Sequence, residues 1–303
     1  MFPLHCSVLA WSGFNVTKLL PPIPEYLIEQ VVAIALAEDI AEGDITSMAV
    51  VGSSSMSEAV LCAESDGIVA GISLAMEVFQ SICSDIAFAS YIHDGDQVCD
   101  GAVVCKIRGP SRAILGGERT ALNFLQHLSG VATLTSKFCE LVKDYKVQIS
   151  ATRKTTPCLR YLEKWAVMVG GGSAHRQSLS DGILIKDNHL ALCNGDVKFA
   201  CQQAKKFSKT EFKIEVEIDA LEDLDSAIDG GADIVLLDNM TVVDVATAVK
   251  AAKGRVLLEV SGGITLENVQ GYAAVGPDII SVGGLTQSAP ALPMNLSLSP
   301  CEK

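Results

Sequence analysis

The chain has 303 residues, enough for a large core and roughly two domains. Apolar residues make up 49% of it and charged residues 19%, which excludes an intrinsically disordered chain. Asp and Glu number 36 against 23 Lys and Arg, so the net charge of −13 argues against nucleic acid or an anionic membrane as a partner.

The N-terminal segment MFPLHCSVLAWSGFNVTKLLPP has neither the basic start nor the small-residue cleavage site of a signal peptide, and with one Lys and no Arg it is a poor mitochondrial presequence. No apolar stretch is long enough to predict a membrane-spanning helix. The ten cysteines contain no CxxC pair, so we expect reduced core residues, such as Cys62, Cys105, Cys193 and Cys201, instead of disulfides or zinc ligands. These features predict a cytoplasmic protein.

The N-terminal part of the chain predicts a small mixed domain. Residues 24–38 have the apolar spacing of a helix. From about 57 to 115, short apolar runs alternate with Gly and Asp-Gly turns, which predicts a mostly antiparallel β region with one helix near 73–82. A long helical pattern then starts at Gly117 and runs to about 144, with a break expected at Ser129-Gly130.

The C-terminal part predicts a parallel sheet. Strand-like apolar runs lie at 147–151, 182–185, 212–218, 233–237, 255–260 and 278–282, with helical segments at 193–208, 219–229, 241–253 and 265–274. Such alternation predicts βα units whose strands are buried on both faces. Each strand is closed by a polar residue or glycine: Arg153-Lys154, Lys186, Glu217, Asp238, Ser261-Gly262-Gly263 and Gly283-Gly284.

Polar groups at every strand end favour a barrel over a doubly wound open sheet. In a βα barrel the C-terminal ends of all strands converge on one face, whereas an open sheet binds ligands in a crevice at one switch point. The barrel is expected to be incomplete, because about 135 residues is short for eight βα units.

Cations are concentrated in residues 151–190, which carry six Lys and Arg against three Asp and Glu, a net charge of +3. Guanidinium forks bind carboxylates and phosphates in a bidentate manner, and Lys adds a point charge. Arg153, Lys154, Arg176 and Lys186 therefore predict a pocket for a small polyanion. Arg160 and Lys164, beside Glu163, are expected to form surface ion pairs on a helix instead.

Carboxylates and glycines close the later strands. Glu217 and Asp238 are candidates to hold Mg²⁺ together with ligand phosphates. Glu215, on the same side of its strand as Glu217, is expected to pair with Lys213 or Lys186. The sequences SGGIT (261–265) and VGGLT (282–286) each follow a strand, so their backbone N–H groups predict phosphate sites.

No nucleophile–base pair is evident beside these groups. Cations, carboxylates and phosphate loops together predict group transfer from a Mg²⁺-bound phosphorylated substrate to a small anionic acceptor.

Six motifs in this order resemble the quinolinate phosphoribosyltransferase family: ATRKTTP, LEKWAVMVGGGSAHRQSLSDGILIKDNH, KIEVE, VLLDNM, LEVSGGIT and DIISVGGLTQSAPALP. The similarity covers about residues 20–292. It implies an α/β protein with an N-terminal α/β sandwich domain, residues 1–130 joined by 287–303, and a C-terminal incomplete α/β barrel of the seven-stranded type, residues 131–286.

The resemblance also implies a reaction and an assembly. Phosphoribosyl pyrophosphate and quinolinate would give nicotinate mononucleotide, pyrophosphate and CO₂ in NAD biosynthesis, with Mg²⁺ as cofactor. The protein would be a homodimer or a hexamer (trimer of dimers), in which Arg119 reaches the site of the neighbouring subunit.

The family's site residues are implied at matching positions. The quinolinate set is Arg119, Arg153, His175, Arg176 and Lys186, with Lys154 assigned to either quinolinate or pyrophosphate. Glu217 and Asp238 would hold the ribose hydroxyls and, directly or indirectly, Mg²⁺. The phosphate loops are Ser261, Gly262, Gly263, Gly283 and Gly284, and the catalytic residues are Lys154, Lys186, Glu217 and Asp238.

Two alternatives remain open at this point. A nicotinate phosphoribosyltransferase would bind a monocarboxylate without releasing CO₂, although the number of cations argues against it. A non-catalytic barrel would bind quinolinate without turnover. The chain departs from the family pattern at Ala174, Trp165 and Gly284, positions that bear on loop packing and not on the charged set.

Overall fold

The computed structural model describes residues 22–208 and 212–301, which form two compact units. The antiparallel unit comprises residues 22–136, Met168–Gly171 and 289–301, and the barrel unit comprises Lys137–Val167 and Gly172–Ser288. The N-terminal segment, for which the sequence predicts no targeting signal, lies outside the described residues. Within the described ranges, no helix combines the length and the apolar character needed to cross a lipid bilayer.

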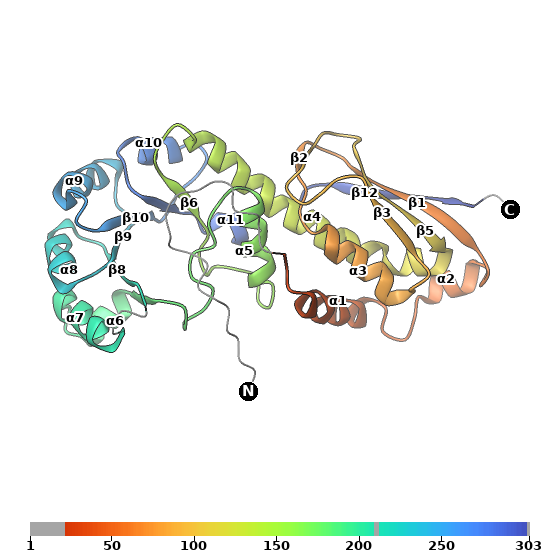
Figure 1. The fold of residues 1–303 in the computed structure, drawn as a ribbon, viewed down its shortest axis with the longest axis horizontal. Helices are drawn as coiled ribbons and strands as arrows, with labels where there is room; N and C mark the ends of the chain where they lie inside the picture. The colour runs from red at the N-terminus through yellow and green to blue at the C-terminus, as the bar shows by residue number, and fades with distance from the viewer. Residues whose placement is uncertain (1–21, 209–211, 302–303) are drawn as a thin grey trace. The chain divides into compact units, whose positions relative to one another are not determined.

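A four-stranded antiparallel sheet of order β12-β1-β5-β3 is the centre of the antiparallel unit (Figure 1). Its elements are α1 (Glu25–Asp39), α2 (Ile45–Val50), β1 (Met56–Ala63), β2 (Gly67–Ile68), α3 (Ile72–Ile82), β3 (Ala87–Ser90), β4 (Gln97–Val98), β5 (Val103–Pro110) and β12 (Met294–Pro300). Alternate residues of β1 are buried, as expected for a sheet with one covered face. The predicted antiparallel region and its helix are confirmed.

Two features of this unit differ from the sequence prediction. Helix α4 (Ser111–Val142) begins before Gly117 and continues through Ser129-Gly130 without the expected break. These two small residues mark a close approach instead: a Cβ on Gly130 would lie 2.2 Å from the carbonyl O of Pro290, and Ser129 Oγ accepts the N–H of Ala70 at 3.0 Å. The segment after Pro290 leads into β12, a strand that the sequence did not predict, which pairs with β1.

The barrel unit contains six parallel strands in the order β6-β11-β10-β9-β8-β7. They are β6 (Gln148–Ser150), β7 (Ile183–Ile185), β8 (Ile214–Ile218), β9 (Ile234–Asp238), β10 (Leu257–Ser261) and β11 (Ile279–Ser281), so all six predicted strands are confirmed. Ser173 adds an isolated parallel bridge to Ser150, beyond the β6 edge. The result is the predicted parallel α/β domain, an incomplete barrel with most strand residues buried.

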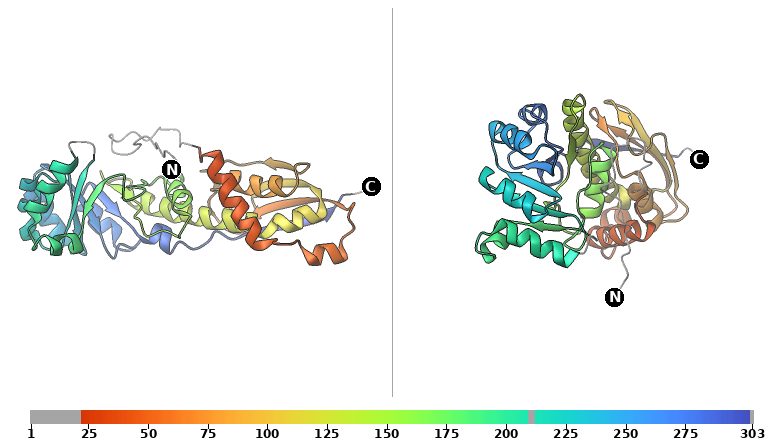
Figure 2. Two further views of the ribbon diagram at one scale, coloured as in Figure 1. Left: turned by 90° about the horizontal axis from the view of Figure 1, so that it is seen from below. Right: turned by 60° about the vertical axis from the view of Figure 1, so that its left-hand side comes forward.

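Helices follow the strands as the alternation predicted. They are α5 (Arg160–Val169), α6 (Asp187–Leu192), α7 (Val197–Ser208), the 3₁₀ turn η1 (Leu221–Asp223), α8 (Leu224–Gly230), α9 (Val242–Ala252), α10 (Val269–Ala274) and α11 (Gly284–Gln287). Helices α6 to α9 follow one another along the outer side of the strands, as the two further views show (Figure 2). The loops that follow the strands lie at the C-terminal ends of the strands, where βα barrels form their sites.

Candidate active site

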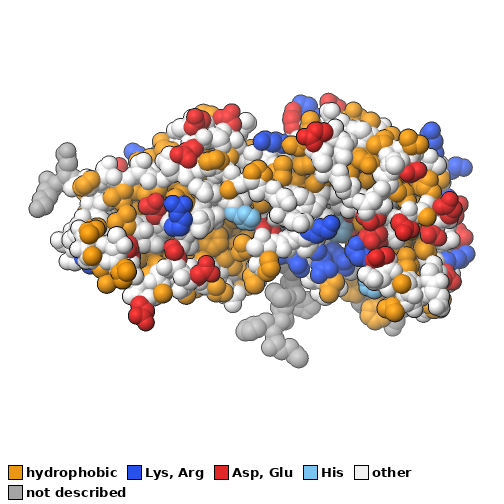
Figure 3. Space-filling view, turned by 180° about the vertical axis from the view of Figure 1, so that it is seen from behind, with side chains coloured by type: hydrophobic (Ala, Val, Ile, Leu, Met, Phe, Trp, Pro, Cys, Tyr) orange, Lys and Arg blue, Asp and Glu red, His pale blue; other side chains and the backbone are white. Residues whose placement is uncertain are grey.

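The segment that follows β6 carries the first two predicted cations. Arg153 is half-buried, and its Nε is buried without a hydrogen-bond partner among the described residues. A buried donor left unpaired costs about 1–3 kcal/mol, so this geometry favours a bound acceptor. Figure 3 shows Lys and Arg side chains gathered next to acidic ones on one face of this otherwise acidic chain.

Lys154 lies against the second glycine loop. A Cβ added to Gly283 would lie 3.1 Å from Cδ and 3.9 Å from Nζ of Lys154. Thr286 Oγ1 donates a hydrogen bond to the carbonyl O of Lys154 at 2.7 Å. The VGGLT loop and the ATRKTTP segment are therefore in contact, and a side chain at 283 would press on Lys154.

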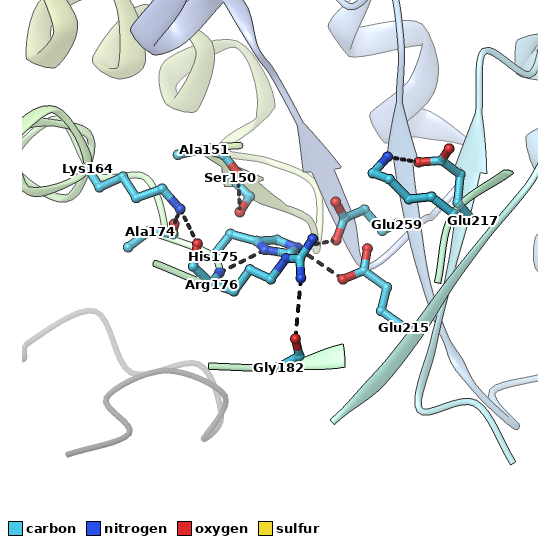
Figure 4. A network of polar contacts seen from close by, with 11 residues as sticks. Ser150, Ala151, Lys164, Ala174, His175, Arg176, Gly182, Glu215, Glu217 and Glu259 are labelled. Carbon is cyan, nitrogen blue, oxygen red and sulfur yellow. Dashed lines mark hydrogen bonds and ion pairs between the residues drawn. The ribbon is translucent and has the colours of Figure 1, made fainter. Parts of the chain in front are cut away.

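His175 is held between two buried carboxylates (Figure 4). Its Nε2 lies 3.2 Å from Glu259 Oε2 and 3.3 Å from Glu215 Oε2, and 8% of its side chain is exposed. The prediction that Glu215 pairs with Lys213 or Lys186 is therefore wrong. Lys213 stands just before β8 and pairs with Asp233 at 3.7 Å, while Lys186 pairs with Glu217.

The two carboxylates determine the charge of the histidine. Burial lowers the pKa of His175, but Glu215 and Glu259 outweigh burial and raise this pKa to about 9. The N–H of Arg176 donates to His175 Nδ1 at 2.8 Å, a bond that only the neutral ring accepts. The net effect is a raised pKa of His175, because the protonated ring places a positive charge beside two carboxylates that face the same ring nitrogen. Burial, followed by Glu259, raises the pKa of Glu215.

Arg176 lies beside the histidine and close to Arg153. Its Nη1 donates to the carbonyl O of Gly182 at 3.3 Å. Burial, and next the charge of Arg153, lower the pKa of its guanidinium. Two arginines that repel one another in a half-buried location create a strong positive potential, which suits a small polyanion.

Helix α5 contributes buried charges that the sequence reasoning misassigned. Glu163 and Lys164 are fully buried, so the expected surface ion pairs with Arg160 are wrong. Glu163 Oε2 accepts the N–H of Thr156 at 3.0 Å, and Lys164 Nζ donates to the carbonyl oxygens of Ala174, at 2.6 Å, and of Arg176. These main-chain partners lie in the loops just before and just after α5, and no pattern of residue types in the sequence reveals the contacts.

The acidic half of the site lies on β8 and β9. Lys186 Nζ forms an ion pair with Glu217 Oε2; 43% of the lysine side chain is exposed and 12% of the glutamate side chain. Asp238, the last residue of β9, aligns with Ser261 on β10, which in turn aligns with Ser281 on β11. Three adjacent strands therefore end level with one another, as the predicted site requires.

The first glycine loop packs on the end of β9. Gly262 has φ +98°, and a Cβ there would lie 2.2 Å from Oδ1 of Asn239. Gly263 also has a positive φ, and Gly284 begins the short helix α11. The loop thus brings its backbone close to Asp238 through Asn239, whose Nδ2 donates to Asp238 Oδ2 at 2.7 Å.

The predicted residues of the barrel unit thus lie at or just beyond the C-terminal ends of its strands, in the separate groups of contacts described above. The exception among the predicted set is Arg119, which is exposed on α4 in the antiparallel unit.

Two sets of side chains could hold a metal ion. His175, Glu215 and Glu259 place their ligand atoms within 4.8 Å of one another. Mg²⁺ prefers oxygen ligands and retains several waters, which this nearly fully buried set with a nitrogen ligand does not suit. Glu217 and Asp238 are less buried, are carboxylates only, and lie on neighbouring strands beside the glycine loops. They fit Mg²⁺ better.

Comparison with known proteins assigns most of the chain to one family. Residues 131–297 match the family described as Quinolinate phosphoribosyl transferase, C-terminal domain, and residues 44–129 match the corresponding N-terminal domain. The chain is 41% identical over 262 residues to a Bacillus subtilis (strain 168) protein named "Probable nicotinate-nucleotide pyrophosphorylase (carboxylating)", covering 86% of this chain and 90% of the relative. It is 36% identical over 313 residues, covering 96% and 89%, to the Nicotiana tabacum "Quinolinate phosphoribosyltransferase (decarboxylating) 2b, mitochondrial".

A solved structure agrees. The crystal structure of NadC from Streptococcus pyogenes superposes with a TM-score of 0.89 at 35% identity, covering 93% of this chain and 100% of that one. The resemblance in the motifs is thereby confirmed over both units. The chain belongs to the quinolinate phosphoribosyltransferase family, the decarboxylating phosphoribosyltransferases of NAD biosynthesis.

Proposed function

We propose that the strand ends of the barrel unit perform the family reaction, in which quinolinate and phosphoribosyl pyrophosphate give nicotinate mononucleotide. Arg153, His175, Arg176 and Lys186 bind quinolinate. The observation that carries this assignment is the buried, unpartnered Nε of Arg153 beside Arg176. Quinolinate has two adjacent carboxylates, which supply acceptors for the guanidinium donors and offset the repulsion between them.

The phosphoribosyl half binds next to this pocket. Ser261, Gly262 and Gly263, with Gly283 and Gly284, cradle phosphate groups through backbone N–H donors. Lys154 contacts the second loop, so it is placed to bind pyrophosphate, with a quinolinate carboxylate as its alternative partner. Glu217 and Asp238 hold the ribose hydroxyls and Mg²⁺, directly or indirectly.

Two bonds change in the transfer step. The quinolinate ring nitrogen forms a bond to ribose C1 as the bond from C1 to pyrophosphate breaks, and C1 gains oxocarbenium character. The carboxylates of Glu217 and Asp238 stabilise that positive charge. Mg²⁺, when bound, neutralises charge on the leaving pyrophosphate. Lys186 orients Glu217 through their ion pair.

Decarboxylation follows from the charge left on the ring. Once the ring nitrogen is alkylated, it carries a positive charge, which stabilises the electron pair left on C2 when the bond from C2 to its carboxylate breaks. CO₂ leaves, and a proton takes its place at C2. Cations must hold this carboxylate without overstabilising it in the ground state, so we assign the strongest clamp, Arg153 with Arg176, to the carboxylate that remains.

Arg119 belongs to a second, assembly-level part of the proposal. It is exposed on α4 and lies in the unit that carries no other member of the predicted set. We assign it to the quinolinate site of a neighbouring subunit, in a homodimer or a hexamer built as a trimer of dimers.

The domains are assigned as residues 1–130, joined by 287–303, and 131–286.

The compartment is assigned to the cytoplasm. The nine cysteines in the described part of the chain are all free, as a reducing compartment requires. Two tobacco relatives are named as mitochondrial, so membership of the family does not by itself assign the compartment. Cell fractionation with an antibody against the protein tests this assignment.

One assay tests the function. The purified protein is incubated with phosphoribosyl pyrophosphate, Mg²⁺ and either quinolinate or nicotinate, and both the mononucleotide and CO₂ are measured. We expect turnover of quinolinate with one CO₂ per mononucleotide. Turnover of nicotinate alone would replace this function by that of a nicotinate phosphoribosyltransferase, and binding of quinolinate without product would indicate a non-catalytic barrel.

A further inference from the structure

Helix α5 sends three charged side chains toward the two segments that carry the site's cations. The first is the strand-end segment, residues 151–156, which carries Arg153 and Lys154. The second is the histidine segment, residues 174–177, which carries His175 and Arg176. All of these residues belong to the barrel unit.

Arg160 bridges the two segments. Its Nε donates to Thr155 Oγ1 at 3.0 Å, and its Nη1 donates to the carbonyl O of Gln177 at 3.3 Å. One guanidinium thus connects Thr155, two positions after Arg153, to Gln177, the residue after Arg176.

Glu163 and Lys164 fix one segment each. Glu163 accepts the N–H of Thr156 at 3.0 Å, at the end of the strand-end segment. Lys164 donates to the carbonyl oxygens of Ala174 and Arg176, which flank His175 on both sides (Figure 4). His175 itself has φ +52°, a conformation that non-glycine residues rarely adopt and that the surrounding contacts must hold.

Glu163 and Lys164 are buried, so their charges act on groups inside the protein. Neither Glu163 nor Lys164 is exposed to solvent, and burial of a charged group costs several kcal/mol unless it is hydrogen-bonded. Burial, with repulsion from Arg160 and Arg176, lowers the pKa of Lys164 to about 7. An apolar residue would avoid this cost. The hydrogen bonds that Glu163 and Lys164 form therefore explain why charged residues stand at these positions.

We propose that Arg160, Glu163 and Lys164 are positioning residues, which hold the strand-end and histidine segments at the spacing that binds the two adjacent carboxylates of quinolinate. None of the three needs to touch the substrate. They act through the main chain on either side of the binding residues, where a displacement of about 1 Å is enough to weaken catalysis strongly. The inference rests on the proposed function, because it takes quinolinate as the ligand of Arg153, His175 and Arg176.

Matched substitutions separate positioning from folding. Lys164→Met removes the donors at similar volume, whereas Lys164→Gln keeps an N–H donor; Glu163→Met and Glu163→Gln form the equivalent pair for an acceptor. We expect the Met variants to raise KM for quinolinate by at least about tenfold and KM for phosphoribosyl pyrophosphate by less than about threefold. The Gln variants should lie nearer to the wild type.

Arg112→Met provides the control. Arg112 also donates from a guanidinium to main-chain carbonyls, those of Val51 and Met48, but in the antiparallel unit. It should lower thermal stability without a selective change in KM for quinolinate. If a Met variant at 163 or 164 does not fold, Thr155→Val removes the acceptor for Arg160, together with the 3.5 Å hydrogen bond from the Thr155 hydroxyl to the carbonyl O of Arg153, and should raise KM for quinolinate a few-fold.

The results that overturn the proposal are specific. A folded Lys164→Met protein with unchanged KM for quinolinate, or with equal increases for both substrates, would show a structural role only. If Lys164→Met does not fold, unchanged quinolinate affinity in Thr155→Val would have the same meaning. Direct calorimetric titration with quinolinate reads these affinities even if the wild type binds without turnover, so failure of the proposed function is recognised separately.

Discussion

Lys186, immediately after β7, forms an ion pair with Glu217 on β8, and the two strands are direct neighbours in the barrel. This contact joins a residue assigned to quinolinate with one assigned to the ribose. Under the proposed assignments, this ion pair connects the quinolinate pocket directly to the ribose pocket.

Substitution of either member of this pair should be costly. We expect Lys186→Met and Glu217→Gln each to lower kcat/KM by roughly 10²–10³, with a double variant that loses less than the product of the two. Lys198 and Asp229 form a comparable pair at 3.2 Å, but with half-exposed side chains outside the site. Lys198→Met should stay within about twofold of the wild type, and full additivity at 186 and 217 would contradict the coupling.

Gly262 tests the loop that packs on Asn239. Gly262→Ala places a Cβ 2.2 Å from Asn239 Oδ1 at a positive φ, so the loop must move. We expect a clear rise in KM for phosphoribosyl pyrophosphate, together with about 1–3 kcal/mol lost from the free energy of unfolding. Gly254 has φ +72° and open space around it; Gly254→Ala isolates the backbone strain and should leave KM unchanged. Equal kinetic effects at 254 and 262 would rule out a specific role for the loop.

The buried amine of Lys164 predicts a dependence of stability on pH. Its pKa is about 7 in the folded protein and near the ordinary lysine value of 10.5 in the unfolded chain. Between these values the unfolded chain binds the extra proton, so this residue makes the folded protein more stable as pH rises, by at most about 1.4 kcal/mol per unit. Below pH 7 the effect is flat, because both states are protonated.

This slope is measurable against Lys164→Met by urea unfolding from pH 6 to 9. The fluorescence of the buried Trp165, in a Trp11→Phe background, reports on the barrel unit. The difference in unfolding free energy between wild type and variant should move in favour of the wild type above pH 7. A difference that is constant over the whole range would exclude a depressed pKa.

Removal of metal distinguishes the two carboxylate sets. We expect EDTA to abolish turnover and Mg²⁺ to restore it, and Asp238→Asn to raise the Mg²⁺ concentration for half-maximal activity about tenfold. Glu259→Gln should change KM for quinolinate, through His175, and leave the Mg²⁺ requirement as it was. The opposite pattern would move the metal to His175, Glu215 and Glu259.

The assignment of Arg119 to a neighbouring subunit predicts complementation. Random exchange between inactive Arg119→Ala and inactive Lys186→Ala subunits should restore up to about a quarter of the wild-type activity, since half of the dimers are hybrids with one intact site. Arg153→Ala mixed with Lys186→Ala should restore none, because both residues lie in one barrel unit. Absence of recovery after demonstrated exchange would place Arg119 outside a shared site.

The strands and most helices of the barrel unit were predictable because their signals are local. Apolar runs such as IEVEI and IVLLD, separated by amphipathic segments, specify buried parallel strands wherever they occur. The residues that follow those strands were also predictable as a group, because a parallel arrangement brings all the C-terminal strand ends to one side. The family motifs then indicated the substrate.

Partnership between distant residues was not predictable. The spacing of Glu215 placed it correctly on the face of Glu217, but only the fold brought His175 and Glu259 to it. Glu163 and Lys164 look like surface charges in the sequence because their partners are carbonyl and amide groups of loops that follow or precede the helix. Likewise, Ser129-Gly130 predicts a helix break from the sequence, whereas in the fold the absence of a side chain at Gly130 allows the chain at Pro290 to pack against the helix.

The sequence by itself determined the order of strands and helices, the residue types at the strand ends and, through the motifs, the family. The tertiary structure alone decided which charges are buried and which main-chain groups hold them. Hydrophobic periodicity is a property of neighbouring residues, whereas burial and hydrogen bonding of a charge depend on segments that only folding brings together.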